Sequence, residues 1–367
     1  MKTITAAVAY GPGQDFKVEE VSLEEPRADE VLVKIVGVGI CHSDLAVKEQ
    51  HLPVPLPAVL GHEGSGIVEK VGSDVTGLAP GDHVVLSFLT CGECGPCTHE
   101  HPSFCQTFIP MNIMSMRPDG SKSIYKDGEP ISSYFFGQSS FGTYALAHQS
   151  NTIKVRDDAP LELLGPLGCG IQTGAGSIMK ALACEADSAL VITGGGAVGL
   201  SAVLGAVVQG CSPIIVVDPM ESRRALALEL GATHVIDPMA TDDLCASLRE
   251  ISPAGMNYAF DTTSIQAVLD GVIPAMAPQS TVGLVGVPKP EAANLSFNVL
   301  TLLSGISVMG ITEGDAIPAN FIPEMIDLYM AGKFPFDKLC KLYPFNDINE
   351  AVAGQAQGDC VKAILQP

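Results

Sequence analysis

The chain has 367 residues, of which 47% are hydrophobic, and a formal net charge of −21 with a pI near 4.6. Nucleic acids and anionic membranes bind basic surfaces, so this charge argues against both as partners. The start, Met1-Lys2-Thr3-Ile4, lacks the apolar core of a secretory signal, and eleven cysteines without such a signal fit reduced thiols in the cytoplasm better than a disulfide framework.

The first 150 residues are rich in short alternating runs separated by glycine and proline. Examples are Val31–Val36, Gly66–Val71 and Asp82–Phe88. Such runs predict one irregular, strand-rich domain.

Two cysteine-containing patterns in this part suggest metal binding. Cys41 follows the first alternating run, and His62 lies between Gly61 and Glu63-Gly64. Together with Cys169, between Gly168 and Gly170, they have the composition of an open zinc site, two thiolates and one imidazole with a free fourth position. Spacing alone would not select these three residues, and a core role for each remains open until other motifs are considered.

The second pattern is more specific, and lies at about residues 91–105. Cys91, Cys94, Cys97 and Cys105 are spaced C-x2-C-x2-C-x7-C with glycine and proline between them. Four thiolates complete a tetrahedral shell, so the spacing predicts a structural zinc lobe without catalysis, with a disulfide pair or four incidental thiols as the alternative.

From about Gly170 the pattern changes to alternating strands and helices, which predicts a doubly wound parallel sheet. The strand-like Ala189–Thr193 leads into a glycine turn, Gly194-Gly195-Gly196-Ala197-Val198-Gly199, that is typical of a dinucleotide site. Ala189–Val208 has no charge over 20 residues, but its three glycines and lack of basic flanks argue against a membrane span.

The cofactor preference depends on the next strand. Ile214–Val217 ends at Asp218, where a carboxylate would accept hydrogen bonds from a ribose diol and repel a 2′-phosphate. This favours NAD, although Arg223 and Arg224 leave NADP open. The sequence becomes mixed again after about residue 312, so we expect one domain at 1–170 and 312–367 and a second at 171–311.

Taken together, these motifs resemble those of the zinc-dependent medium-chain alcohol dehydrogenases, most closely the bacterial aryl-alcohol and geraniol dehydrogenases. The resemblance covers nearly the whole chain and is most specific in Gly39–Asp44, Gly61–Gly66, the four-cysteine lobe, Gly165–Gly174 and the glycine turn with Asp218. It implies an α/β protein, with a GroES-like β-rich catalytic domain and a Rossmann domain, that binds NAD and two Zn²⁺ ions.

The resemblance also implies roles for individual residues. Cys41, His62 and Cys169 would bind the catalytic zinc with Glu63 nearby, Asp44 would orient His62, and Ser43 would hydrogen-bond the substrate oxygen. The cofactor-binding residues would be His42, Thr173, Gly194, Gly196, Val198, Gly199, Asp218, Arg223, Val287 and Lys362, with His42 and Lys362 at the pyrophosphate. An apolar substrate pocket would be lined by Leu52, Phe88, Phe135, Phe136, Val287 and Ile311.

The implied reaction is reversible oxidation of a primary aromatic or allylic alcohol to its aldehyde. A general aliphatic alcohol dehydrogenase and a glutathione-dependent formaldehyde dehydrogenase are alternatives, whereas an inactive zinc and nucleotide scaffold is disfavoured because the ligand motifs are intact. One departure concerns the proton relay, because the histidine of many relatives is Ala46 here. Lys48 or water is the expected substitute, and His51 is expected on a solvated loop.

The expected partners are a small-molecule alcohol or aldehyde and further copies of the chain. The segment Asn294–Val299 resembles the edge through which relatives pair, which implies a homodimer or homotetramer.

Overall fold

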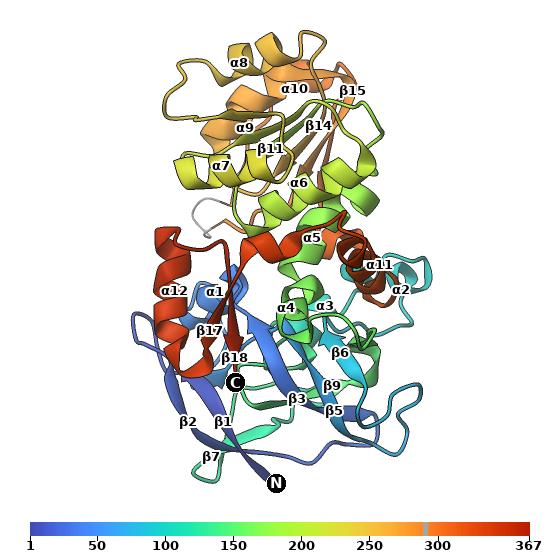
Figure 1. Cartoon of the computed structure of the whole chain (residues 1–367), viewed down its shortest axis with the longest axis vertical. Coiled ribbons are helices and arrows are strands. Elements are labelled where there is room, and N and C mark those ends of the chain that lie inside the picture. The colour runs from blue at the N-terminus through green and yellow to red at the C-terminus, as the bar shows by residue number, and fades with distance from the viewer. Residues whose placement is uncertain (289–292) are drawn as a thin grey trace. The chain divides into compact units, whose positions relative to one another are not determined.

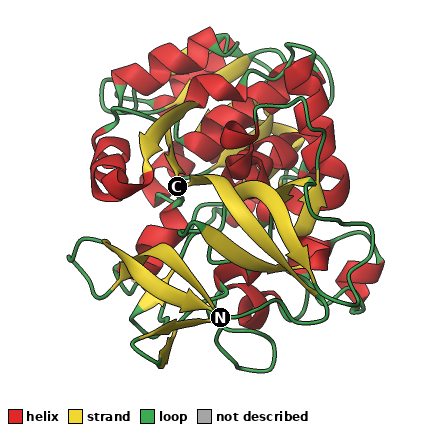
Figure 2. Cartoon of the chain, turned by 60° about the horizontal axis from the view of Figure 1, so that its bottom comes forward, coloured by secondary structure: helices red, strands yellow, loops and turns green. Residues whose placement is uncertain are grey.

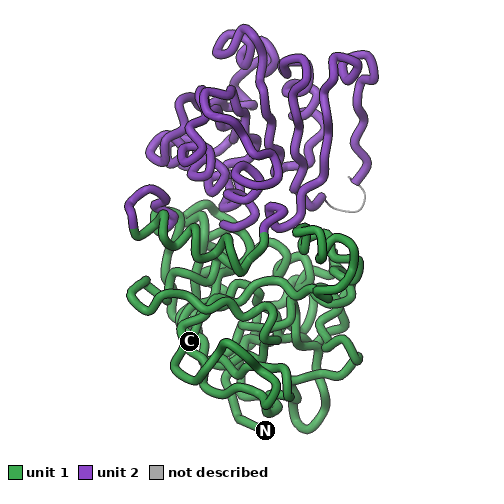
Figure 3. Tube along the Cα trace, turned by 90° about the vertical axis from the view of Figure 1, so that its right-hand side faces the viewer, with its two compact units in different colours: residues 1–170, 317–330, 337–367 green, residues 171–316, 331–336 purple. Residues whose placement is uncertain are grey.

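A computed structural model describes residues 1–288 and 293–367, and they form two compact units (Figure 3). Unit 1 comprises Met1–Gly170, Ile317–Met330 and Asp337–Pro367, and unit 2 comprises Ile171–Ala316 and Ala331–Phe336. Unit 2 thus includes residues 312–316 and 331–336, and Ile311 continues the pairing of its sheet by donating its N–H to Leu284 O (2.8 Å).

Unit 1 is built mainly from two sheets, whose strand pairs are antiparallel except for the parallel pair of β17 and β18 (Figures 1 and 2). One has the strand order β4-β1-β2-β7-β8, and the other has the order β10-β6-β5-β3-β18-β17 with β9 also paired to β3. The strands are β1 (Lys2–Ala9), β2 (Lys17–Leu23), β3 (Glu30–Gly39), β4 (Ala58–Val59), β5 (Gly64–Val71), β6 (His83–Leu86), β7 (Ile124–Lys126), β8 (Glu129–Ile131), β9 (Tyr144–His148), β10 (Thr152–Lys154), β17 (Cys340–Pro344) and β18 (Lys362–Gln366).

Helices of 4 to 13 residues lie between these strands. They are α1 (His42–Lys48), α2 (Gly95–Thr98), α3 (Phe108–Asn112), α4 (Leu161–Leu164), α11 (Pro318–Met330) and α12 (Ile348–Gln357). The C-terminal strand completes the unit, since β18 pairs antiparallel with β3 at Ile364–Gly39 and Leu365–Val38. The last residues of the chain thus lie beside the strand that leads into Cys41.

Unit 2 is a six-stranded parallel sheet with helices packed against it. Its order, β13-β12-β11-β14-β15-β16, reverses direction at β11, which is the arrangement of a doubly wound fold. Strands β11 (Leu190–Thr193) and β12 (Ile214–Val217) are buried at every position, as expected for a sheet covered on both faces. The predicted α/β class, a β-rich unit plus a doubly wound parallel sheet, is confirmed.

The remaining elements of unit 2 alternate along the chain. They are α5 (Gly170–Gly176), α6 (Ala197–Gln209), α7 (Glu221–Glu229), β13 (His234–Ile236), α8 (Leu244–Ile251), β14 (Met256–Asp261), α9 (Gln266–Val272), β15 (Met276–Leu284), α10 (Val299–Leu302) and β16 (Ser307–Gly310). The uncharged run at 189–208 is divided between β11 and α6. Among the described residues, no helix combines the length and the apolar character that crossing a bilayer requires.

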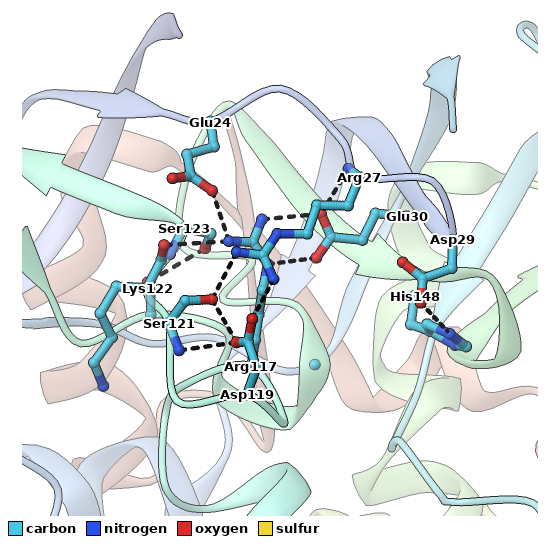
Figure 4. Close-up of polar contacts among 12 residues, drawn as sticks. Glu24, Arg27, Asp29, Glu30, Arg117, Asp119, Ser121, Lys122, Ser123 and His148 are labelled. Carbon is cyan, nitrogen blue, oxygen red and sulfur yellow. Dashed lines mark hydrogen bonds and ion pairs between the residues drawn. The ribbon is translucent and has the colours of Figure 1, made fainter. Parts of the chain in front are cut away.

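A buried ion pair between Arg117 and Glu30 links the segment after α3 to the start of β3, and Glu24 extends it to a cluster of three charged residues (Figure 4). Arg117 donates from Nε and Nη2 to the two oxygens of Glu30 (2.6 and 2.9 Å) and from Nη1 to Glu24 (2.7 Å). A cavity of about 320 Å³ opens beside this cluster, and Tyr134 also borders it. The guanidinium carbon lies 5.6 Å from the centre of the Tyr134 ring. The cluster therefore supports the chain segment that begins at Tyr134.

Candidate metal centres and nucleotide site

Four potential metal ligands from three distant segments converge in unit 1. One donor atom each from Cys41, His62, Glu63 and Cys169 lies within 4.8 Å of the others. Cys41 follows β3 and precedes α1, His62 and Glu63 connect β4 to β5, and Cys169 precedes α5. Three of the four side chains are buried, and Cys41 is partly buried.

Asp44 connects two of these ligands. Its Oδ2 accepts the backbone N–H of Cys41 (3.0 Å), which caps the start of α1, and its Oδ1 lies 2.9 Å from His62 Nδ1. A carboxylate at Nδ1 sets the tautomer in which Nε2 is the free acceptor, as metal-binding histidines require.

The donor set fits a zinc ion. His62 Nε2 is buried and has no hydrogen-bond partner among the described residues, which is rare for a buried nitrogen. The hydrogen bond with Cys169, together with the nearby His62, holds the pKa of the Cys41 thiol well below its usual value, which favours the thiolate that binds metal. Two sulfurs, an imidazole nitrogen and an adjacent carboxylate are the ligand types that Zn²⁺ takes.

Lys362 is buried beside these metal ligands. Its Nζ is 2.9 Å from each oxygen of Glu63 and 3.1 Å from Ile40 O, and the side chain is buried. Burial alone would lower the pKa of Lys362, but Glu63, followed by Cys41, raises it above its usual value. In this position the lysine neutralises the carboxylate beside the metal ligands.

The four-cysteine lobe has the geometry of a closed metal site. Its Sγ–Sγ distances are 3.5 Å for Cys91–Cys105 and Cys94–Cys97, and 4.0 Å for Cys91–Cys97 and Cys94–Cys105. A tetrahedron with Zn–S bonds of about 2.3 Å has sulfurs roughly 3.8 Å apart. All eleven cysteines are free thiols, so the disulfide alternative is not realised. Backbone N–H groups of residues 93 and 94 lower the pKa of Cys91 to about 6.

The glycine turn of unit 2 has the conformation of a phosphate-binding loop. Gly194 has φ +92°, and a Cβ on Gly199 would lie 1.8 Å from Gly194 O, so neither position accepts another residue. Gly196 precedes the first turn of α6, and a Cβ added to Gly196 would meet nothing within 4 Å. Val198 lies in that first turn. Backbone N–H groups at the start of a 13-residue helix therefore border open space, which suits an anionic phosphate.

Asp218 closes this loop at the end of β12. Its Oδ2 accepts the N–H of Gly195 (2.6 Å) and its Oδ1 that of Met220 (2.7 Å), so the carboxylate is held in one orientation. Arg223 Nη1 lies 3.7 Å from Asp218 Oδ2.

The residues expected to line the substrate pocket divide between the two units. Leu52, Phe88, Phe135 and Phe136 belong to unit 1, whereas Ile311 is buried and Val287 exposed in unit 2. The Phe136 ring stacks on His62 with centroids 4.4 Å apart, and the Phe135 ring meets the same imidazole edge-on at 5.3 Å.

One aromatic residue of this group was missed from the sequence. Phe108 on α3 connects Phe88 (5.7 Å) to Phe136 (6.1 Å), measured between ring centroids. It follows the last cysteine of the lobe by three residues, and no spacing pattern distinguishes it.

The remaining predicted residues lie in or just after the short helices α1 and α5. Ser43 is half-buried in the first turn of α1 and His42 is exposed beside it. Thr173 on α5 donates to Glu313 (3.4 Å). Lys48 ends α1 with its Nζ 2.6 Å from Glu49, and His51 is exposed, as expected for a solvated position.

Comparisons with known proteins agree on both units. Residues 27–157 match the family model for the alcohol dehydrogenase GroES-like domain, and residues 197–331 match that for zinc-binding dehydrogenases. The chain is 49% identical over 362 residues to geraniol dehydrogenase of Castellaniella defragrans, covering 98% of this chain and 96% of the relative.

Two crystal structures with nearly half of their residues identical share the fold. Benzyl alcohol dehydrogenase from Acinetobacter calcoaceticus superposes with a TM-score of 0.96 at 46% identity, over 100% of this chain and 99% of the other. An alcohol dehydrogenase zinc-binding domain protein from Burkholderia ambifaria has a TM-score of 0.97 at 48% identity, with the same coverage.

Proposed function

Because the chain belongs to the zinc-dependent medium-chain alcohol dehydrogenase family, as predicted, we propose that it oxidises primary aromatic or allylic alcohols to aldehydes with NAD as hydride acceptor. The observation that carries the proposal is His62 Nε2, which is buried, close to two thiols and without a hydrogen-bond partner in the part of the chain that the structure describes. Relatives named for geraniol and benzyl alcohol, nearly half identical to this chain, support the substrate class.

The two groups of ligands would hold two zinc ions with different roles. Cys41, His62 and Cys169 would hold the catalytic ion, and Glu63 would lie beside it with its charge balanced by Lys362. When bound there, zinc supplies a Lewis acid that lowers the pKa of the alcohol. A second ion held by the four cysteines would stabilise only the lobe, because its shell is complete.

The proton of the alcohol requires a route to solvent. Ser43, two residues after Cys41, would accept the hydrogen bond of the substrate hydroxyl. Lys48 is paired with Glu49 at 2.6 Å, and an ammonium has three donors and no acceptor. We therefore favour transfer from Ser43 to water over the lysine.

The cofactor is positioned by unit 2. NAD supplies the electrophilic carbon of its nicotinamide ring as hydride acceptor. The start of α6 would bind the pyrophosphate and Asp218 the adenosine ribose diol, with Arg223 beside it. The fixed Asp218 carboxylate favours NAD over NADP because it would repel a 2′-phosphate.

The aromatic residues around His62 support an aromatic or allylic substrate. Phe88, Phe108, Phe135 and Phe136 form a continuous cluster of rings that ends on the imidazole. Flat, conjugated alcohols match such a surface better than short aliphatic ones.

An assay of NAD reduction with benzyl alcohol, geraniol and ethanol in parallel tests this proposal. We expect rapid NADH formation with the first two and little with ethanol. Preferential ethanol turnover would favour a general aliphatic enzyme, activity only with hydroxymethylglutathione would favour the formaldehyde class, and no turnover by protein containing two zinc ions would contradict the reaction itself.

We also propose that the enzyme is a cytoplasmic homodimer or homotetramer. The segment of residues 294–299 leads through α10 to β16, an edge strand of the unit 2 sheet, and Val299, Leu300 and Leu303 expose 65%, 78% and 75% of their surface. Apolar side chains of this exposure fit an interface between copies. Light scattering of the eluted protein measures the state, and a monomer at micromolar concentration would contradict the proposal.

A further inference from the structure

The segment Tyr134–Ser139 has a backbone that its sequence would not favour. Four of its six residues have positive φ, namely Tyr134 (73°), Phe136 (51°), Gly137 (64°) and Ser139 (53°). Three of them carry side chains, for which the left-handed region is sterically costly. All six are buried, so the surrounding contacts must impose this conformation.

Buried polar side chains hold the segment in place. The Asn151 amide donates to Phe136 O (3.2 Å) and Gly137 O (3.3 Å). Ser139 Oγ accepts the N–H of Phe135 (2.8 Å) and donates to Val59 O (2.6 Å). These bonds satisfy backbone groups that a left-handed turn leaves outside any sheet.

Gln138 joins the segment to the metal ligand. Its amide donates to His62 O (2.9 Å) and Ser87 O (3.2 Å), while its Oε1 accepts the N–H of Gly64 (3.2 Å). The position of the segment is thus fixed relative to the backbone of His62.

The left-handed turn has a direct consequence for His62. Consecutive side chains of an extended strand point to opposite sides. Here the positive φ of Phe136 lets both it and Phe135 contact the same imidazole, Phe136 nearly parallel (22°) and Phe135 nearly perpendicular (89°).

The imidazole needs this second restraint. The bond to Asp44 fixes Nδ1 but leaves the ring free to tilt about that atom, which would carry Nε2 away from the thiols of Cys41 and Cys169. A parallel ring at 4.4 Å blocks such tilting. We propose that Phe136 is a positioning residue for the metal centre, which keeps His62 Nε2 directed at the two thiols; this inference rests on the proposed zinc site.

Metal release from the purified holoenzyme tests the inference without alcohol or cofactor. A coloured chelator reports two ions per chain, and the phase that is lost in Cys169→Ser identifies the ion at His62. We expect Phe136→Leu to accelerate this phase about tenfold or more, as loss of ligand-orienting contacts does elsewhere, and to leave the four-cysteine phase unchanged. Phe136→Tyr retains the flat ring and should release metal at the wild-type rate.

A matched control separates positioning from general loosening of the core. Phe345, like Phe136, is 5% exposed in the unit 1 core, and none of its ring contacts involves His62 among the described residues. Phe345→Leu should leave the His62 phase unchanged. If Phe136→Leu released metal no faster than Phe345→Leu, the inference would be wrong.

Two further measurements keep the outcomes distinct. Should Phe136→Leu fail to fold, Phe136→Met fills a similar volume without a flat ring, and the same acceleration is expected. If the wild-type protein released metal slowly and the variant released it fast, the positioning role would be supported even in a protein that reduces no NAD. The absence of NAD reduction would then contradict only the proposed function.

Discussion

Replacing Arg117 by methionine should destabilise unit 1 far more than the loss of an ordinary ion pair. Arg117 and Glu30 are only 2% and 3% exposed at their side chains, and two hydrogen bonds join them. A third bond reaches Glu24, whose side chain is 24% exposed. Methionine fills most of the volume but leaves the Glu30 carboxylate buried without its cation.

The expected magnitude follows from that stranded charge. Removing one partner of a buried pair costs about 3–5 kcal/mol, because desolvation of the other is no longer compensated. For a folding unit of this size, we expect a decrease in Tm of roughly 10 °C. Replacing Glu30 by glutamine in the same chain should restore part of the loss, since the remaining buried group is then neutral.

Thermal unfolding in zinc-containing buffer, followed by circular dichroism, measures this effect. Arg156 is the matched control, because it makes the same pattern of three bonds, to Asp158 (2.6 and 2.9 Å) and Asp327 (2.8 Å), but is 43% exposed. Arg156→Met should shift Tm little. Equal shifts for the two variants would refute the argument from burial.

The contribution of Arg117 should also depend on pH. Burial alone would raise the pKa of Glu24, but hydrogen bonds from Arg117 and Tyr125 lower it below its ordinary value. A depressed carboxyl pKa stabilises the fold above the unfolded-state pKa of about 4.3 and stops doing so as pH falls through the folded-state value. The Tm difference between wild type and Arg117→Met should therefore narrow below about pH 4, and a difference that widened there would contradict this assignment.

Three changes at the functional sites give further expected outcomes. Asp218→Ser should weaken the binding of NAD and lower the preference of the enzyme for NAD over NADP roughly a hundredfold, because two hydrogen bonds to a charged group are lost. An unchanged ratio of kcat/KM for the two cofactors would contradict the assignment of Asp218 to the ribose. Cys94→Ser should lower the metal content to one zinc per chain and reduce stability, which metal analysis and thermal unfolding measure together. Lys48→Met combined with His51→Gln should leave the pH–rate profile of alcohol oxidation unaltered, because water takes the proton. A shifted profile would instead show that one of these two side chains relays the proton.

The sequence predicted those parts of the protein that depend on short local patterns. Glycines beside His62 and Cys169, and Gly39 two residues before Cys41, marked places of close backbone approach, and the structure brings the three ligands together. The glycine turn and Asp218 likewise lie at adjacent strand ends, because parallel strands place their carboxyl ends at one edge of a sheet. The predicted family is confirmed by the comparisons, and the prediction rested on these same short motifs.

The features that escaped prediction are set by contacts between distant segments. The contact of Lys362 with Glu63, about 300 positions earlier, depends on the pairing of β18 with β3, and no local pattern predicts it. Nothing local in Tyr134-Phe135-Phe136 predicts left-handed residues, because the hydrogen bonds that hold the segment come from Asn151 and run from Gln138 to the distant His62. Tertiary contacts of this kind override local preference.

Transfer of hydride from the alcohol to the cofactor is tested most directly by isotopic labelling. The purified zinc-loaded protein is incubated with NAD and benzyl alcohol carrying two deuterium atoms on its carbinol carbon, and the reduced cofactor is analysed by mass spectrometry. We expect one deuterium per reduced nicotinamide, monodeuterated benzaldehyde, and loss of both products after the ion at His62 is removed. Unlabelled reduced cofactor, or full activity without that ion, would contradict zinc-dependent hydride transfer.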